Sequence, residues 1–240
     1  AWFCFLNDTA TPAIYTLSVR GALPSWAALA ARWKLVLVED AAEALGSRWR
    51  GRHMGGFGRL SALSFNGNKI VTTGGGGAVL TDDPALAKRA KHLTTTAKVP
   101  HRWAFDHDET GWNYRMPNLN AALGCAQLER LPDMLARKAV VAERYVRAFA
   151  GVEGVRMMTP REGASVNHWL NALILDRPDR AARDRLLETL NDAGYQARPL
   201  WTLMHRLPMY ADCPRDDLAV AGGLEDRVIN LPSSAALADD

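Results

Sequence analysis

The 240-residue sequence lacks long hydrophobic runs and carries little excess charge. No stretch approaches the roughly 18 consecutive apolar residues of a membrane-spanning helix, and the opening AWFCFLNDTATP has no basic segment like that of a secretory signal. Lysine plus arginine (29) exceed aspartate plus glutamate (26) by only 3, and these charges form no cluster. We therefore expect a cytoplasmic protein with no membrane and no nucleic-acid partner.

Cysteine is also scarce. The three cysteines, Cys4, Cys125 and Cys213, are an odd number and show no CxxC spacing. This pattern argues against a disulfide framework and against a structural zinc site. The sequence predicts reduced thiols and no bound metal.

Apolar residues make up 48% of the chain, enough for a core of one large domain or slightly more. Apolar residues at helical spacing from Trp26 to Trp33 predict a helix, and the aliphatic run 35–38 predicts a buried strand. A strand without polar alternation is typical of a parallel sheet that is covered on both faces, where ligands bind beyond the carboxyl ends of the strands. Because Glu39 and Asp40 follow this run, we expect Asp40 at a ligand crevice.

Further strands are predicted over 60–65 and 78–81, followed by a helix that Asp82 or Asp83 caps and that has Pro84 in its first turn. The segment 94–117 has no apolar period, so it is predicted to be a long loop with a function.

Asn118 is predicted to cap the next helix, and a longer helix is expected over 134–149. Beyond residue 151 the pattern predicts a charged helix from about 180 to 193 between strands at 169–175 and 195–198. We expect a domain boundary near residue 151 and too few strands in the second part for a sheet of ordinary size.

Lys69 stands out because a strand ending in Ser64 precedes it and a run of four glycines follows it. A desolvated lysine acts as a nucleophile, and its commonest cofactor use is an imine with a pyridoxal aldehyde. That cofactor needs a carboxylate beside its pyridine nitrogen, which Asp40 is placed to provide, and a phosphate partner, which Ser64 is placed to provide. A solvated loop lysine and a strand-end aspartate remain open as alternatives at this point.

Two other glycine-loop interpretations fit less well. A phosphate-binding Walker loop places its lysine after the glycines, whereas Lys69 precedes them. A dinucleotide-binding fingerprint needs a helix directly after its glycines, and no helical pattern follows the glycines of 51–58. A flexible turn remains an equally good interpretation of the glycine run itself.

Four motifs occur in order: VEDAAEALGS (38–47), LSFNGNKIVTTGGGG (63–77), GWNYRMPNLNAALGCAQLERL (111–131) and INLPSS (229–234). Together they resemble the sugar-nucleotide aminotransferases of the DegT/StrS group. The resemblance covers residues 13–237 and implies pyridoxal 5'-phosphate (PLP) as the cofactor. It also implies the α/β fold of type I PLP-dependent transferases, with an incomplete, mostly parallel large domain (1–150) and a small α+β domain (151–240).

The resemblance also implies roles for single residues. Lys69 matches the lysine that forms the imine with the cofactor, and Ser64 matches a phosphate-binding serine. Asp40 matches the aspartate at the ring nitrogen, and Glu43 falls where the family has a glutamine or glutamate beside the ring hydroxyl. Asn113 matches an asparagine that reaches the phosphate of the neighbouring subunit, which implies a homodimer with shared sites.

The implied reaction transfers an amino group from glutamate to the keto carbon of a nucleotide-linked sugar, with Lys69 moving the proton. The stretches NHWLNALIL (167–175) and RPLWTLMHRLPMY (198–210) are similar to the branch that aminates UDP-linked N-acetylhexosamine 4-keto-6-deoxy sugars. The branch acting on GDP-linked 4-keto-6-deoxymannose is the nearest alternative. His205 and Trp201 are expected near the sugar nucleotide, although a packed or solvated loop residue describes His205 equally well and core packing is commoner for Trp201.

The sequence departs from the family pattern at both ends. The family's phosphate-gripping glycine-threonine loop and the aromatic residue that stacks on the ring are not visible before residue 21, and a final helix is missing after Ser234. The sequence therefore predicts a truncated chain. A catalytically inactive remnant that only dimerises is the alternative to an active aminotransferase.

Overall fold

The computed structural model describes residues 22–239, with side chains from Trp26 onward. Cys4 and the segment LSVRG (17–21) lie outside the described residues. The described chain forms two compact units. The first contains the described residues up to Pro132 together with Gly163–Asn167, and the second contains Asp133–Glu162 and the described residues from His168 onward. The division into domains at residues 150 and 151 stays a prediction.

The elements of the first unit are α1 (Ala22–Arg32), β1 (Val38–Asp40), β2 (Arg48–Trp49), β3 (Arg52–His53), β4 (Leu60–Ser64), β5 (Gly77–Leu80), α2 (Pro84–Thr94), α3 (Asn118–Glu129) and β7 (Ala164–Ser165). One sheet has the strand order β1-β4-β5, and a smaller sheet has the order β3-β2-β7. Strands β1 and β4 are parallel, with Asp40 opposite Ala62, as the aliphatic pattern predicts. Strand β5 runs antiparallel to β4.

Strand β1 begins later than the apolar run predicts. The run 35–38 suggests a strand over those residues, but the ladder begins at Val38, which lies opposite Leu60, the first residue of β4. An apolar run indicates burial, whereas a strand also needs a partner, and the partner starts at Leu60. As a result Glu39 and Asp40 belong to the strand itself.

Side-chain caps explain where helix α2 begins. The Asp83 carboxylate accepts hydrogen bonds from Ala85 N (2.9 Å) and Leu86 N (3.2 Å), and Pro84 occupies the first turn, as predicted. The prediction that Asn118 caps α3 is wrong, because Pro117 is the cap residue and Asn118 is the first helical residue. Proline fixes an extended conformation just before the helix and therefore sets the start without a side-chain bond.

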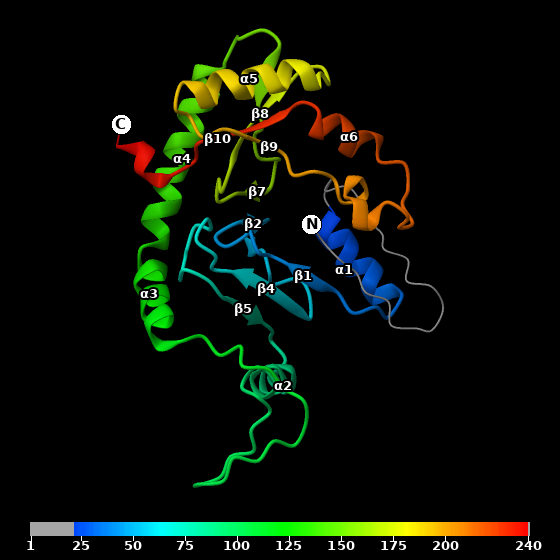
Figure 1. Ribbon diagram of the computed structural model, residues 1–240, viewed down its shortest axis with the longest axis vertical. Coiled ribbons are helices and arrows are strands. Elements are labelled where there is room, and N and C mark those ends of the chain that lie inside the picture. The colour runs from blue at the N-terminus through cyan, green and yellow to red at the C-terminus, as the bar shows by residue number, and fades with distance from the viewer. Residues whose placement is uncertain (1–21, 240) are drawn as a thin grey trace. The chain divides into compact units, whose positions relative to one another are not determined.

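The segment between α2 and α3 is a long loop, as the sequence predicts, and Figure 1 shows it folding back on itself beyond the end of α2. Isolated bridges join Thr95 to Asn113 and Lys98 to His107 across the loop. Gly111 permits the close approach of the two arms, since a Cβ atom there would lie 2.5 Å from Ala97 N. The loop is therefore ordered by backbone pairing.

The elements of the second unit are α4 (Leu131–Ala148, apart from its first two residues), β6 (Val155–Met157), β8 (Asn171–Leu175), α5 (Arg180–Asp192), β9 (Arg198–Pro199), α6 (Ala219–Glu225), β10 (Val228–Leu231) and the short 3-10 helices η1 (Met204–Arg206), η2 (Pro208–Tyr210) and η3 (Ala235–Ala238). The four strands form an antiparallel sheet in the order β6-β8-β10-β9. The expectation of too few strands is therefore wrong. Sequence patterns missed β6 and β10 because such short strands carry too few residues to show a period.

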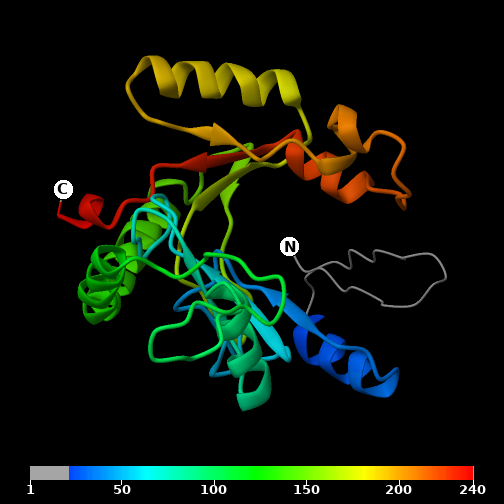
Figure 2. The same ribbon diagram turned by 60° about the horizontal axis from the view of Figure 1, so that its bottom comes forward.

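The core of the second unit lies on one face of this sheet. Leu173 and Leu175 of β8 and Ile229 and Leu231 of β10 are buried there, and side chains of α4 and α5 pack against them. Figure 2 shows α5 running alongside the strands. The described cysteines, at positions 125 and 213, are free thiols, and both are exposed. None of the helices within residues 22–239 is both long and apolar enough to cross a membrane.

Candidate active site

Lys69 lies in the loop between β4 and β5. Hydrogen bonds of Phe65 join the two ends of this loop. Phe65 N donates to Gly76 O (3.0 Å), and Phe65 O accepts from Thr73 N (3.0 Å). The side chain of Asn120, on α3, donates to Thr73 O at 2.5 Å. The glycine run is thus part of a closed loop that is fixed at its base, and Lys69 is presented from it.

The Lys69 amine forms an ion pair with Glu43. Lys69 Nζ lies 2.6 Å from Glu43 Oε1, while the Lys69 side chain is only 12% exposed and the Glu43 side chain 45% exposed. Lys69 is therefore not an ordinary solvated loop lysine. An amine that is largely withdrawn from water and bonded to a carboxylate keeps a defined position, which a flexible four-carbon side chain otherwise lacks.

Asp40 is the last residue of β1, and its side chain is exposed. Its Oδ1 atom accepts a hydrogen bond from Ala42 N at 3.1 Å. Because β1 and β4 are parallel and Asp40 is level with Ala62, the carboxyl ends of both strands meet at one edge of the sheet. The Asp40 carboxylate and the Lys69 loop both start from this edge, which is where ligands bind in such sheets.

Ser64 ends β4 at the same edge. Its Oγ atom accepts a hydrogen bond from Asn66 N at 3.3 Å, and a hydroxyl that accepts one bond still has its own proton to donate. Asp40, Glu43, Ser64 and Lys69 therefore all belong to the carboxyl ends of two neighbouring parallel strands or to the loops that follow them.

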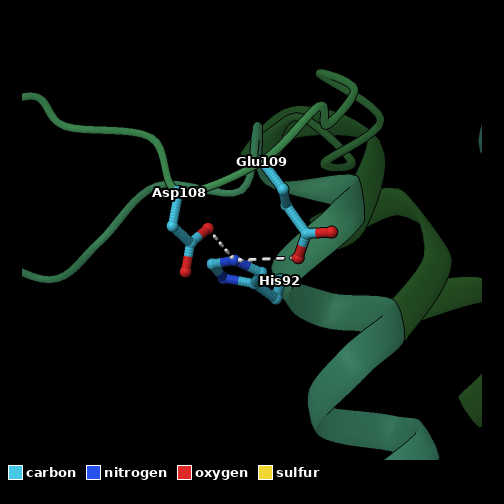
Figure 3. Close-up of side chains that lie close together, drawn as sticks. All are labelled: His92, Asp108 and Glu109. Carbon is cyan, nitrogen blue, oxygen red and sulfur yellow. Dashed lines mark hydrogen bonds and ion pairs between the residues drawn. The ribbon is translucent and has the colours of Figure 1, made fainter.

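Asn113 lies in the long loop opposite Thr95, and its side chain is exposed. An ion-pair cluster nearby fixes this part of the loop to α2. His92 Nε2 lies 2.6 Å from Asp108 Oδ1 and 3.5 Å from Glu109 Oε1, as Figure 3 shows. Arg89 donates to both carboxylate oxygens of Glu109. These contacts hold the returning arm of the loop, which carries Asn113.

The same cluster also has the ligand types of a metal site, because one atom each of His92, Asp108 and Glu109 lie within 4.8 Å of one another. The guanidinium of Arg89 already occupies both Glu109 oxygens, and a cation would have to displace it. The hydrogen bond from His92 lowers the pKa of Asp108, and the hydrogen bond from Arg89 lowers the pKa of Glu109. The arrangement is that of an ion-pair network, and the absence of a metal stays a prediction.

Trp201 and His205 belong to the second unit. The Trp201 ring stacks on Trp169, with centroids 5.9 Å apart and planes inclined by 19°, yet Trp201 is 65% exposed. Core packing, the commoner role of such a residue, is therefore wrong for Trp201. His205, in η1, lines an open cavity of about 490 Å³ whose charged lining residues are Arg206, Arg215, Asp216, Asp217 and Asp226.

Sequence patterns missed two buried polar residues of the first unit. Glu39 is fully buried, and its carboxylate accepts hydrogen bonds from Gly55 N (2.7 Å), Phe57 N and Gly58 N. Asn167 is also buried, and its side chain contacts the loop that carries Glu43. A Glu-Asp pair gives no signal of which acid is buried, and the partner of Asn167 is more than 100 residues away in sequence.

The residues present fit PLP. This cofactor requires an amine, a carboxylate and a phosphate partner. The structure provides the largely buried Lys69 amine, the Asp40 carboxylate at the end of β1 and the Ser64 hydroxyl at the end of β4. Asp40 and Ser64 would hold its ring nitrogen and phosphate, and Lys69 would bind its aldehyde.

Comparison with known proteins agrees with this fit. Residues 9–240 match the DegT/DnrJ/EryC1/StrS aminotransferase family. The chain belongs to this family, whose members depend on PLP, and it has the fold of type I PLP-dependent enzymes.

Two curated relatives and one solved structure illustrate the similarity. EpsN of Bacillus subtilis (strain 168), provisionally named a pyridoxal phosphate-dependent aminotransferase, is 36% identical over 208 residues, 85% of this chain and 53% of its own length. GDP-perosamine synthase of Caulobacter vibrioides is 36% identical over 213 residues, 88% of this chain and 57% of its own. The aminotransferase TlmJ of Streptoalloteichus hindustanus matches with a TM-score of 0.83 and 29% identity over 90% of this chain and 58% of its own. The chain thus spans little more than half the length of these relatives.

Proposed function

We propose that this chain carries the PLP-binding site of a sugar-nucleotide aminotransferase, which transfers an amino group from glutamate to the 4-keto carbon of a nucleotide-linked 4-keto-6-deoxy sugar. The observation that carries the proposal is the Lys69 amine, largely buried and held at 2.6 Å by Glu43, in a loop at the sheet edge where Asp40 ends β1. Membership of the aminotransferase family supports the reaction class.

Each residue has a distinct part in this proposal. PLP supplies the aldehyde that takes up the amino group and a protonated ring that withdraws electrons. Asp40 keeps the ring nitrogen protonated through its negative charge, and Ser64 donates its proton to the phosphate. As general base Lys69 Nζ would take the proton from the glutamate carbon and pass it to the cofactor carbon, and in the second half of the reaction it would carry a proton from the cofactor carbon to the sugar carbon. Glu43 keeps the Lys69 amine oriented between these two steps.

The nucleotide is the finer part of the proposal. UDP-linked N-acetylhexosamine derivatives are the first substrate class indicated by the sequence, and a GDP-linked 4-keto-6-deoxymannose is the second. The similarity to GDP-perosamine synthase supports the second class. Amino transfer from glutamate, measured with both sugar nucleotides at equal concentration, distinguishes the two.

Three further assignments belong to the proposal. Asn113 contributes to the cofactor phosphate of a neighbouring subunit in a homodimer, which the ordered loop arm beside α2 supports. Trp201 and His205 contact the sugar nucleotide, which the exposed indole pair and the open cavity support. The cytoplasmic location stays a prediction.

Borohydride trapping tests the central claim. The chain is mixed with PLP, reduced with borohydride and digested, and the pyridoxyl group is expected on the peptide that contains Lys69. The variant K69A is expected to lose this adduct, while K88A, which removes an exposed lysine of α2, keeps it. A chain that carries no adduct at Lys69 but self-associates, even as K69A, would instead be the catalytically inactive dimerising remnant.

A further inference from the structure

Asn167 joins two segments of the first unit that are far apart in sequence. Its Nδ2 atom donates hydrogen bonds to Glu43 O (2.7 Å) and Leu45 O (2.9 Å), across 124 and 122 residues. Its backbone N–H donates to Ser47 Oγ at 3.1 Å. The residue is only 6% exposed, so these bonds are shielded from water.

The segment that Asn167 holds is the loop after β1. This loop has no regular secondary structure and contains only tight turns, in which Ala44 N donates to Ala41 O and Ser47 N donates to Ala44 O. One side chain of this loop, Glu43, is the ion-pair partner of Lys69. The side-chain amide of Asn167 therefore bonds the backbone of the residue whose carboxylate sets the position of the Lys69 amine.

The chemistry of the contact favours an asparagine. A side-chain amide offers two N–H donors, and here they serve two carbonyl oxygens. An ionised aspartate of the same shape only accepts, so it would place negative charge against both carbonyls. A glutamine keeps the donors but adds one carbon, which changes the distance to both acceptors.

We propose that Asn167 is a positioning residue for Lys69, which acts through Glu43 by fixing the loop from which the Glu43 carboxylate reaches the amine. The consequence for catalysis rests on the proposed function of Lys69. The positioning itself is a property of the chain without cofactor, and it is testable there.

The test measures how fast an acylating reagent labels the Lys69 amine in the cofactor-free chain at a fixed pH, with the exposed Lys88 as internal reference. An amine that Glu43 holds in a largely buried position meets a reagent less often than an amine that is free to move into solvent. The variant E43Q is expected to raise the labelling of Lys69 relative to Lys88 by about 3-fold to 10-fold. N167A is expected to raise the labelling of Lys69 by at least the square root of the E43Q factor, which is about 3-fold if E43Q raises the labelling 10-fold.

The double variant N167A/E43Q identifies the path. If Asn167 acts through Glu43, the double variant labels no faster than E43Q alone, because residues on one path are not additive. Additive effects would show that Asn167 influences Lys69 by another route, and wild-type labelling in a folded N167A would show no influence. Either result overturns the proposal.

Asn171 provides a matched control. It is equally buried (5% exposed), and its side chain and backbone N–H both donate to Ser233 Oγ in the second unit. N171A removes a comparable buried amide without touching the Glu43 loop, so the labelling of Lys69 is expected to stay at the wild-type value. A rise equal to that of N167A would mean that loss of stability alone exposes the amine, and the proposal would fail.

If N167A does not fold, N167Q carries the test, because it keeps the amide and changes only its reach. Faster labelling of Lys69 in folded N167Q supports the proposal, and wild-type labelling overturns it. With cofactor and substrates present, a positioning role lowers kcat and leaves KM for glutamate within about 2-fold. Failure of borohydride trapping at Lys69 would remove the proposed function but leave the labelling result unaffected.

Discussion

Glu39 and Asp40 are neighbours in β1, yet their carboxylates lie in opposite environments. Glu39 is fully buried and accepts hydrogen bonds from three backbone N–H groups of the 55–58 loop, whereas Asp40 is exposed at the end of the strand. Successive side chains of a strand point to opposite faces, which explains the difference. One acid therefore stabilises the fold, and the other is available to a ligand.

This difference predicts that replacing each acid by its isosteric amide affects a different property of the protein. E39Q places an NH2 group against backbone donors and is expected to lower the free energy of unfolding by about 2 kcal/mol. D40N is expected to change it by less than about 0.5 kcal/mol, and to lower amino transfer by about 100-fold because the ring nitrogen loses its charged partner. Urea unfolding measures the first quantity and the amino-transfer rate the second. Equal destabilisation by both variants would contradict the assignment.

The glycine run 74–77, whose last residue begins β5, contains positions of unequal importance. A Cβ atom on Gly77 would lie 2.2 Å from Leu63 O, whereas a Cβ atom on Gly75 would meet nothing within 4 Å. G77A is therefore expected to disturb the pairing of Gly77 with Ser64 and to cost about 2 kcal/mol of unfolding free energy. G75A, two residues away, is expected to stay within about 0.5 kcal/mol of the wild type in the same urea titration. A neutral G77A would show that the strands separate there at little cost.

The local features of this site could be predicted from the sequence. The parallel pair of strands, a helix cap at Asp82 or Asp83 and the loop position of Lys69 each follow from a few neighbouring residues, and the structure shows that Asp83 is the cap. The family resemblance placed Glu43 beside the ring hydroxyl of the cofactor, but its contact with Lys69 was not predicted, because it joins two loops 26 residues apart.

Long-range contacts and short strands could not be predicted in this way. Asn167 reaches its partners across more than 120 residues, and nothing in its neighbourhood marks it as buried. Strand β10 lies in a motif that the sequence makes conspicuous, INLPSS, but four residues that are all buried show no alternation. A tryptophan usually packs in a core, whereas Trp201 is largely exposed and stacks on Trp169.

The cluster at the long loop predicts a loss of order at low pH. The pKa values of Asp108 and Glu109 lie below their ordinary values of 3.8 and 4.5, first because of the hydrogen bonds from His92 and Arg89. Carboxyl groups with lowered pKa values stabilise the fold above those ordinary values, and the contribution disappears as pH falls through the lowered ones. The amide of Trp112, which donates to Leu93 O, is therefore expected to keep its exchange protection at pH 5–7 and to lose it only as pH falls below the ordinary carboxyl value of 3.8.

A variant and a metal titration check the same cluster. R89A is expected to lower the protection of the Trp112 amide about 3-fold at pH 7, because Glu109 loses both of its guanidinium bonds. Zinc at micromolar concentration is expected to leave the melting temperature unchanged. A rise in melting temperature that H92A abolishes would show instead that His92, Asp108 and Glu109 bind a cation.

We expect the buried Lys138 to raise the free energy of unfolding at high pH. Burial lowers the pKa of this α4 lysine from 10.5 to about 8, although its amine donates to Trp169 O (3.3 Å) and Ser233 O. Between these two pH values the unfolded chain binds more protons than the folded chain, so the free energy of unfolding rises with pH across about 8 to 10.5. We expect this gain, relative to K138M, to be on the order of 1–2 kcal/mol.

The comparison with K138M isolates this lysine, because tyrosines and other lysines that titrate in the same range are common to both chains. Methionine has a similar length and no charge, so the difference in unfolding free energy between the two chains should be constant below about pH 8 and should change only above it. Chemical denaturation at several pH values from 7 to 10.5 measures that difference. A difference that stays constant over the whole range would show that the folded chain holds the Lys138 proton as firmly as the unfolded chain does.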